Sequence, residues 1–543
     1  MKTFGIYLAY GPRTDLRSEG LGRHLAEFLR ASTDFTDARF VIAAPGWMRS
    51  PLLDLFKNFD LDADAFEIIS PKRPSLIGVL YTSVIAVSER RKKIRKKLDG
   101  KGRLKKAATA LKKLARRSFI NVVRSRNPLV FVAVALFAIA AAPIAAILGL
   151  CVVVPIGALS LLRKVHPMRK IIRLKKTLDR NGFLTQLSHN GYRLMCDLEA
   201  SSVADAASER RDVVAWYSPA AFWPEFNQIT APRVMCVPDA VPIHFSVAFA
   251  TDEPSPDRRL QDFRRLESAI EGGDRFVTYS QDVRDRTLVR HFHIDPSRVT
   301  VVRHGANRLD DIIKVSGFAD NEEATDVLSA RHLWTALCKS MNNPNAAWYA
   351  SKDTGFLFYA SQIRPNKNVM TLLKAYQHLR HDRAFPYKLI LTGNLEHSVD
   401  VSNFMDDMHL HDDVIFVRGL SERELASCYR LAALSVNPSL SEGGMPFTFS
   451  ESVSVGTPVI MADIPVTREI LGSHEVASKT LFDAMDYRAV ARAIDNAMET
   501  REELLKLQED FYSQHIVGRS YRDVVGETIA VLEQAAEFEE DKR

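Results

Sequence analysis

The chain has 543 residues, of which 46% are hydrophobic and 26% are charged. This length exceeds one ordinary core, so two or more domains are expected, and the composition excludes a disordered chain. The five cysteines include no Cys-x-x-Cys pair, which argues against a disulfide framework or a structural zinc site and favours a reducing compartment. The net charge of +7 conceals an asymmetry, because residues 90–180 hold 25 Lys or Arg and only two Asp or Glu.

The first ninety residues alternate between strand and helix patterns. The apolar runs "KTFGIYLAY", "RFVIAAP" and "FEIIS" predict buried strands, and "GLGRHLAEFLRA" predicts a helix after the first of them. The N-terminal run is too short for a secretory signal and is interpreted as a strand. Gly20 and Gly22 stand at the helix start, where a ligand could approach the backbone, although such a pair is more often a plain turn.

Basic clusters within residues 90–180 frame 35 uncharged residues, 128–162. A straight helix of that length would span about 52 Å, against a hydrocarbon core of about 30 Å. Pro143 would also break or kink it. We therefore expect a helical hairpin that dips into or crosses the membrane, with its flanking cations facing anionic headgroups on the cytoplasmic side.

Two other interpretations of this segment are weaker. A hairpin buried in a soluble core would rarely be framed by so many cations, and a nucleic-acid arm has no use for an apolar centre. No nucleic-acid partner is expected.

After this segment, strand patterns again alternate with helix patterns, which predicts parallel βαβ units. Residues 309–353 interrupt the alternation with one helical pattern, 324–341, and divide it into two halves. Two such halves in tandem place a ligand cleft between the carboxyl ends of their strands. The predicted strands are "DVVAWYSP", "RVMCVPDAVP", "DRFVTYS" and "RVTVVRHGAN" in the first half, and "GFLFYAS", "KLILTGN", "VIFVRG", "LSVNPS" and "PVIMAD" in the second.

The stretch "SEGGMPFTFSE", residues 441–451, lies at a strand-to-helix junction of the second half. Its glycines would let a ligand approach the backbone, and the free N–H groups at the helix start favour an anion. A glutamate that binds sugar hydroxyls would complete a nucleotide-sugar site. Alternatively, Thr448 and Glu451 fit a capping box, in which Glu451 only satisfies the first turn. Taken alone, the stretch supports both interpretations equally.

Arg364 and Lys367, in "SQIRPNKN", follow the first strand of the second half. Two cations at a strand carboxyl end could neutralise a leaving diphosphate, although, taken alone, such residues are somewhat more often solvated surface charges.

The order of these elements resembles the GT-B-fold glycosyltransferases of family 4, retaining enzymes that use nucleotide-sugar donors. The resemblance covers roughly residues 1–90 and 180–534 and is strongest from 356 to 471. There "ASQIRPNKNVMTLLKAY", "KLILTGN" and the stretch after "LSVNPS" follow one another with the family's spacing. The motifs "QIRPxKN" and "EGGxPFTFSE" are similar to motifs of α-mannosyltransferases of bacterial surface polysaccharides. This resemblance favours GDP-mannose slightly over UDP-sugars as the donor.

The resemblance implies roles for individual residues. Arg364 and Lys367 would hold the donor pyrophosphate and help it depart, and Asp239 would orient the acceptor hydroxyl, unless it is a buried structural carboxylate. Glu451 would bind the donor ribose. The remaining implied donor-binding residues are Glu442, Gly443, Gly444, Thr448, Gly20 and Gly22.

Two positions depart from the family pattern. Eight residues separate Glu442 from Glu451, whereas the family has seven. Glu451 keeps the family's spacing to Gly456, so Glu442 is the residue that is displaced by one position. Gln362 stands where the family often has an arginine.

The resemblance also implies the organisation of the chain. We expect an α/β protein with two Rossmann-like domains facing a central cleft. The predicted segments are an acceptor-side domain (1–89 and 181–308), a basic membrane-associated insert (90–180, with its hairpin at 128–162), a connection (309–353), a donor-binding domain (354–515) and a C-terminal helix (516–543) that can pack back on the first domain.

The sequence therefore predicts a retaining, metal-independent hexosyltransferase with no cofactor besides its GDP- or UDP-sugar donor. It would transfer the sugar, with mannose slightly favoured, to a lipid-linked glycan at the cytoplasmic face of the inner membrane, in surface polysaccharide or lipopolysaccharide synthesis. The main alternative is a catalytically degenerate membrane-bound scaffold or glycan-binding protein. A nucleotide-sugar epimerase is weaker, because it would not need the membrane segment.

Overall fold

The computed structural model describes residues 1–72, 78 and 183–542, except residues 13, 15, 17–19, 60, 240, 246–255, 341–354, 396 and 397. The chain forms two compact units, Met1–Pro74 with Glu199–Arg543, and Ser75–Leu198. The predicted hairpin at 128–162, like the whole basic segment 90–180, lies outside the described residues. No helix in the part that is described combines the length and the apolarity needed to cross a bilayer.

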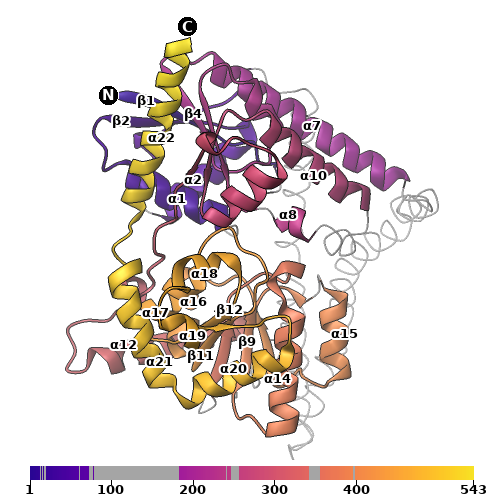
Figure 1. The fold of residues 1–543 in the computed structure, drawn as a ribbon, viewed down its shortest axis with the longest axis vertical. Coiled ribbons are helices and arrows are strands. Elements are labelled where there is room, and N and C mark those ends of the chain that lie inside the picture. The colour runs from indigo at the N-terminus through magenta and orange to yellow at the C-terminus, as the bar shows by residue number, and fades with distance from the viewer. Residues whose placement is uncertain are drawn as a thin grey trace, which may run out of the picture. The chain divides into compact units, whose positions relative to one another are not determined.

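The larger unit contains two parallel sheets, which confirms the predicted α/β class (Figure 1). The first sheet has the order β3-β2-β1-β4-β5-β6-β7, in which the chain direction across the sheet reverses between β1 and β4. Its strands are β1 (Lys2–Tyr7), β2 (Ala38–Ala43), β3 (Glu67–Ile69), β4 (Val213–Ser218), β5 (Arg233–Val237), β6 (Arg275–Thr278) and β7 (Val299–Val301).

The second sheet has the order β10-β9-β8-β11-β12-β13 and reverses between β8 and β11. Each strand predicted from the apolar runs is present, whereas β13, only two residues long, was not predicted. The strands are β8 (Phe356–Tyr359), β9 (Lys388–Thr392), β10 (Val414–Val417), β11 (Leu434–Asn437), β12 (Val459–Ala462) and β13 (Leu481–Phe482).

Helices connect the strands of both sheets, as parallel pairing requires. In the first half they are α1 (Gly20–Ser32), α2 (Arg49–Asn58), α7 (Phe183–Ser208), α8 (Val241–His244) and α10 (Pro256–Glu271), with a π-helical segment at Val283–His291. Beyond them are α11 (Asp310–Ile313), α12 (Asn321–Ser340), α14 (Val369–Arg383), α15 (Val399–Asp407), α16 (Glu422–Leu431), α17 (Phe447–Ser454), α18 (Pro465–Leu471), α19 (Val476–Thr480), α20 (Tyr487–Glu499), α21 (Arg501–Phe511) and α22 (Tyr521–Lys542).

The strands of the second sheet are apolar on both faces. Along β8, Leu357 and Tyr359 join one hydrophobic core, while Phe356 and Phe358 join another. Successive side chains of a strand point to opposite faces, so the two cores lie on opposite sides of the sheet. This explains the continuous apolar runs in the sequence, which are typical of parallel strands covered on both faces.

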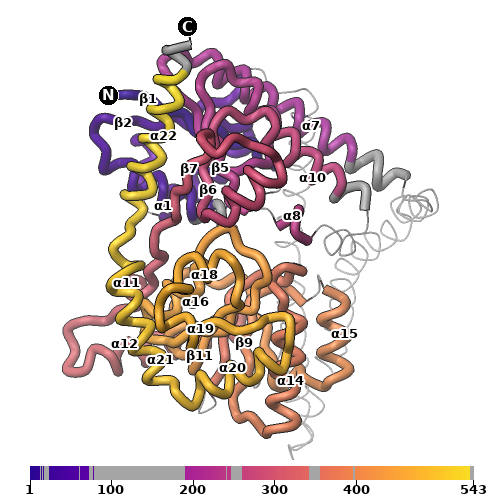
Figure 2. The backbone as a smooth tube through the Cα atoms, in the orientation of Figure 1, coloured from indigo at the N-terminus to yellow at the C-terminus, as the bar shows by residue number. Residues whose placement is uncertain are grey.

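Two chain segments pass between the two sheets, one after β7 and one before α22 (Figure 2). They are bonded to each other, since the Ala306 amide donates to the Arg519 carbonyl (3.1 Å) and the Arg519 guanidinium donates to the Arg303 carbonyl (2.7 Å). The second segment leads into α22, whose Val525 and Leu532 are fully buried in the core of the first sheet. The C-terminal helix therefore completes the first half of the chain.

A buried polar cluster joins α22 to the rest of the first half. His24 of α1 is 6% exposed, and its ring nitrogens lie 3.0 Å from the Tyr279 hydroxyl and 3.4 Å from the Tyr521 hydroxyl. Burial lowers the pKa of His24 to about 4, and the nearby His304 lowers it as well. His24 is therefore neutral in the folded protein at neutral pH.

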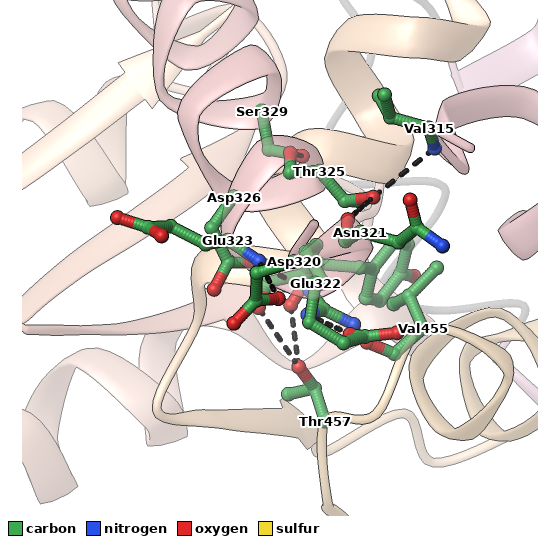
Figure 3. A network of polar contacts seen from close by, with 12 residues as sticks. Val315, Asp320, Asn321, Glu322, Glu323, Thr325, Asp326, Ser329, Val455 and Thr457 are labelled. Atoms are coloured by element: carbon green, nitrogen blue, oxygen red, sulfur yellow. Dashed lines mark hydrogen bonds and ion pairs between the residues drawn. The ribbon is translucent and has the colours of Figure 1, made fainter. Parts of the chain in front are cut away.

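An arginine fixes the turn between α17 and β12. Arg430, in the last turn of α16, pairs with Glu322 (2.5 Å) and Asp326 (2.7 Å) of α12 and donates to the Val455 carbonyl (3.2 Å). Figure 3 labels Glu322, Asp326 and Val455, the three residues that bind this guanidinium. The end of α17 is thereby tied to two other helices.

Replacing Thr457 with valine should lower the free energy of unfolding by about 1–2 kcal/mol, as expected for loss of a buried hydrogen bond. Thr457 is fully buried in this turn, and its hydroxyl donates to the Tyr429 carbonyl at 2.7 Å (Figure 3). Urea denaturation would measure the change. Thr500→Val is the matched control, because that exposed hydroxyl donates to the Asn496 carbonyl at 2.9 Å. Equal effects of the two variants would contradict this account.

Lowering the pH from 7.5 to 5 should destabilise the protein by about 2 kcal/mol through His24 alone. The unfolded chain binds a proton there below a pKa of about 6.5, whereas the folded chain does so only near 4, so stability falls within this window. His24→Gln, which keeps a polar group in the cluster, should lose less stability over the same range, as measured by denaturation at both pH values. His381→Gln on the exposed part of α14 serves as control. An unchanged pH dependence in His24→Gln would overturn this assignment.

Candidate functional site

The candidate site lies at the carboxyl edge of the second sheet, where the strand order reverses. The loop after β8 carries Arg364 and Lys367, and the loop after the adjacent β11 carries Glu442. The Lys367 ammonium lies 2.5 Å from a Glu442 carboxylate oxygen, and both side chains are about one-fifth exposed. The structure thus brings two of the predicted residues into direct contact at the position where open α/β sheets bind ligands.

Asn366 holds the two loops together. Its carbonyl accepts from the Leu440 amide (2.8 Å) and the Ser439 hydroxyl (3.2 Å), while its side-chain amide donates to the Ser441 carbonyl (3.2 Å). Asn366 is 3% exposed, and its neighbour Asn368 adopts a left-handed backbone with φ of 52°. The backbone of Lys367 is therefore held in a tightly bonded turn beside the loop after β11.

Arg364 begins the same turn, since its carbonyl accepts from the Lys367 amide at 3.0 Å. Its side chain is exposed and has no hydrogen bond or ion pair with any residue that the structure describes. Gln362, which replaces the family's arginine, is also exposed. Arg364 is thus a cation available to an anionic ligand at this edge.

The glycine pair allows close contact with the first half of the chain. A β-carbon at Gly443 would clash with the Pro238 carbonyl oxygen, and one at Gly444 would lie 3.0 Å from Tyr279 and 3.1 Å from His304. The Gly443 carbonyl also accepts from the Ser280 hydroxyl at 2.8 Å. These glycines are required by the approach of the two halves, whatever further role they have toward a ligand.

Asp239 follows Pro238 and faces the same loop. Partial burial raises its pKa, the Glu442 carboxylate raises it further, and Lys367 and Arg364 oppose this rise. The four charged groups therefore belong to one electrostatic cluster, contributed by the loops after β5, β8 and β11. An aspartate with a raised pKa is more easily protonated, which would reduce its repulsion of a bound phosphate.

The capping-box alternative for Thr448 and Glu451 is wrong. Helix α17 begins at Phe447 with Pro446 at the N-cap, and no side chain caps it. Thr448 instead accepts from the side-chain amide of Asn437 (3.2 Å), and Glu451, 6% exposed, accepts from that of Asn307 (2.6 Å). The Glu451 carboxylate is therefore bound by Asn307, which lies in the segment after β7.

The predicted glycines of the first half have a local role. Helix α1 begins at Gly20, and a β-carbon at Gly22 would clash with the Leu16 carbonyl oxygen. Gly22 thus lets the loop after β1 fold back over the helix start. His24, the next buried polar residue of α1, bonds Tyr279, and Tyr279 in turn borders Gly444.

A cavity of about 280 Å³ borders α17. Its walls include Phe449 and Ser450 of α17 and both segments that pass between the sheets. Among the residues that the structure describes, its lining includes neither Arg364 nor Lys367. The cavity thus borders Gly444 through Tyr279 and His304, although the two cations do not line it.

Sequence reasoning missed three residues of the site, Asn307, Ser280 and Asn366. Asn307 and Ser280 follow β7 and β6, so the rule that parallel strands present their carboxyl ends at one edge could have marked them. In the part of the chain that is described, no group of three or more His, Cys, Asp or Glu side chains could hold a metal ion.

Residues 345–514 match the family model described as "Glycosyl transferases group 1". Among curated proteins, an O-antigen chain mannosyltransferase RfbU of Salmonella typhimurium is 24% identical over 38% of this chain and 47% of its own length. O-antigen chain mannosyltransferase B of Escherichia coli is 31% identical over 22% of this chain and 31% of its own. The chain thus spans less than half the length of these relatives.

Among solved structures, Anabaena Alr3699/HepE in complex with UDP and glucose aligns with 98% of this chain and 100% of its own. The TM-score is 0.53 and the sequence identity 11%, so the similarity concerns the fold, which is GT-B. Residues 345–514, which match the group 1 glycosyltransferase model, include the turn with Lys367, the glycine pair and α17, and the chain has the GT-B fold.

Proposed function

We propose that the protein is a retaining glycosyltransferase that moves a hexose from a nucleotide-sugar donor to a lipid-linked glycan. The observation that carries this proposal is the contact of Lys367 with Glu442 at the strand-order reversal of the second sheet. Together with the exposed Arg364 it sets two cations in the loops near the start of α17, whose free amide groups favour an anion.

The charges of the cluster suggest how a donor would bind. A diphosphate carries more negative charge than one carboxylate, so it would draw Lys367 away from Glu442 and pair with Lys367 and Arg364. Glu442 would then be released toward the sugar. Glu451, held by Asn307, would accept a hydrogen bond from the ribose of the donor. Gly443, Gly444 and Thr448 would form the wall beside the phosphates, and Gly20 and Gly22 would border the site from the first half.

The transfer itself would break the bond between the anomeric carbon and the donor phosphate oxygen. The acceptor hydroxyl, oriented by Asp239, would form the new bond on the same face, and its proton would pass to the departing diphosphate. The Lys367 and Arg364 cations stabilise that diphosphate as its charge develops. Retention follows because the leaving group and the acceptor share one face of the sugar.

The donor sugar is proposed by similarity alone. The two O-antigen mannosyltransferases favour mannose and hence GDP-mannose, whereas the Anabaena protein binds UDP. The same relatives favour a role in surface polysaccharide or lipopolysaccharide synthesis. The uncharged stretch 128–162 and its basic flanks support attachment to anionic headgroups at the cytoplasmic face of the inner membrane.

Replacing Lys367 with alanine should weaken binding of the nucleotide-sugar donor by about tenfold to a hundredfold, the range for a charge-assisted hydrogen bond. Thermal stabilisation by a series of GDP- and UDP-sugars measures this directly, because a bound ligand raises the melting temperature. Lys374→Ala, an exposed lysine further along α14, is the matched control and should behave as wild type. If no member of the series stabilises the wild-type protein, the transferase proposal fails and the scaffold alternative is favoured.

Deleting residues 128–162 should leave donor stabilisation unchanged but impair transfer to an acceptor presented in a membrane. The deletion removes the apolar stretch that would hold the enzyme at the bilayer, whereas the donor cluster lies on other elements. The assay compares transfer to a lipid-linked glycan in vesicles with donor stabilisation of the same sample. Full transfer to the vesicle-bound acceptor without this stretch would contradict the membrane role.

A further inference from the structure

Four aromatic side chains gather at the carboxyl edge of the first sheet. Tyr10 follows β1, Trp47 follows β2, and Phe222 and Trp223 follow β4. We call these four residues the aromatic row. The strand order β2-β1-β4-β5 places them along consecutive strands, and Asp239 follows the next strand, β5. The row therefore begins one strand away from the charged cluster.

The members of the row are held edge to face. The Tyr10 and Trp223 rings lie 4.8 Å apart at 87°, and those of Phe222 and Trp223 lie 6.5 Å apart at 90°. The Trp47 indole donates to the Tyr10 carbonyl at 2.9 Å. Each ring is thus fixed by a neighbour, which keeps the entropy cost of ligand binding low.

Core packing accounts for only part of this row. Trp223 is 5% exposed, but Phe222 is 44% exposed, and Tyr10 and Trp47 are only partly buried. The turn that presents Phe222 is itself fixed, since the Ser218 hydroxyl donates to the Ala220 carbonyl at 2.8 Å. Phe222 is thus the member of the row most open to a ligand, at the sheet edge that also carries Asp239.

We propose that the aromatic row binds the pyranose rings of an oligosaccharide acceptor, with the reacting sugar at Asp239 and the following sugars over Phe222, Tyr10 and Trp47. The proposal rests on the glycosyltransferase function proposed above. The C–H face of a pyranose is apolar and packs against an aromatic ring, while its hydroxyl edge stays hydrated. Phosphate groups or free nucleotides would instead require cations.

The length of the aromatic row fits an oligosaccharide better than a monosaccharide. Neighbouring strands lie about 4.8 Å apart, so β5 and β2 are separated by about 14 Å. A single pyranose ring cannot cover that distance. The acceptor is therefore expected to be an oligosaccharide, and its affinity should rise with the number of rings until the row is covered.

The test is tryptophan fluorescence titration of the full-length protein in detergent micelles. The probes are α-linked manno-oligosaccharides of one to four rings, with gluco- and galacto-oligosaccharides of the same lengths. In wild type, the dissociation constant for at least one series should fall as rings are added. Phe222→Ala should raise the constant for the trisaccharide by about threefold to tenfold, as expected for one lost aromatic contact. Phe318→Ala, another exposed phenylalanine, should change nothing.

Donor stabilisation, measured on the same samples, separates this inference from the proposed function. The proposed acceptor site is refuted if wild-type binding does not depend on oligosaccharide length. It is also refuted if trisaccharide binding is unchanged in both Phe222→Ala and Trp47→Phe. Donor stabilisation would persist in either case. Length-dependent binding without any donor stabilisation supports the row but overturns the transferase, leaving a glycan-binding protein.

Discussion

The hydrogen bonds of Asn366 are the constraint on which the candidate site depends. Two loops that are 75 residues apart in sequence become one surface because its carbonyl and its side-chain amide bind the loop after β11. Lys367 follows directly, so its backbone is held beside the loop that carries Glu442, and its ammonium pairs with that carboxylate. A cation held in place before the ligand arrives stabilises developing charge more effectively than a mobile one, because little reorganisation is needed.

This surface is continuous with the first half of the chain. Gly443 and Gly444 allow backbone contact with Pro238 and Tyr279, and the Ser280 hydroxyl bonds the Gly443 carbonyl. The raised pKa of Asp239 reflects the same proximity, since Glu442 contributes to it across this boundary. The arrangement suits a reaction that joins two substrates, each of which would be held by one half.

Much of this could be predicted from the sequence, for identifiable physical reasons. Strands buried on both faces leave uninterrupted apolar runs, and parallel strands present their carboxyl ends at one edge, so Arg364, Lys367 and Glu442 could be placed near one another. The pairing of Lys367 with Glu442, the bonds of Asn366 and the partner of Glu451 could not, because they depend on loops distant in sequence. Thr448 and Glu451 have capping-box spacing, and only the position of Pro446 at the N-cap rules that geometry out.

Helix α22 affects how the protein is made. Its Val525 and Leu532 belong to the core of the first sheet, yet they follow every strand of both sheets in the chain. The first half therefore cannot close its core before α22 has been synthesised, whereas the second sheet has all its strands by residue 482. Domains often fold as they emerge, with the N-terminal domain first. Here the second half would complete its fold before the first half. Until α22 has emerged, the apolar surface that it covers beside β4 and β5 would be open to chaperones.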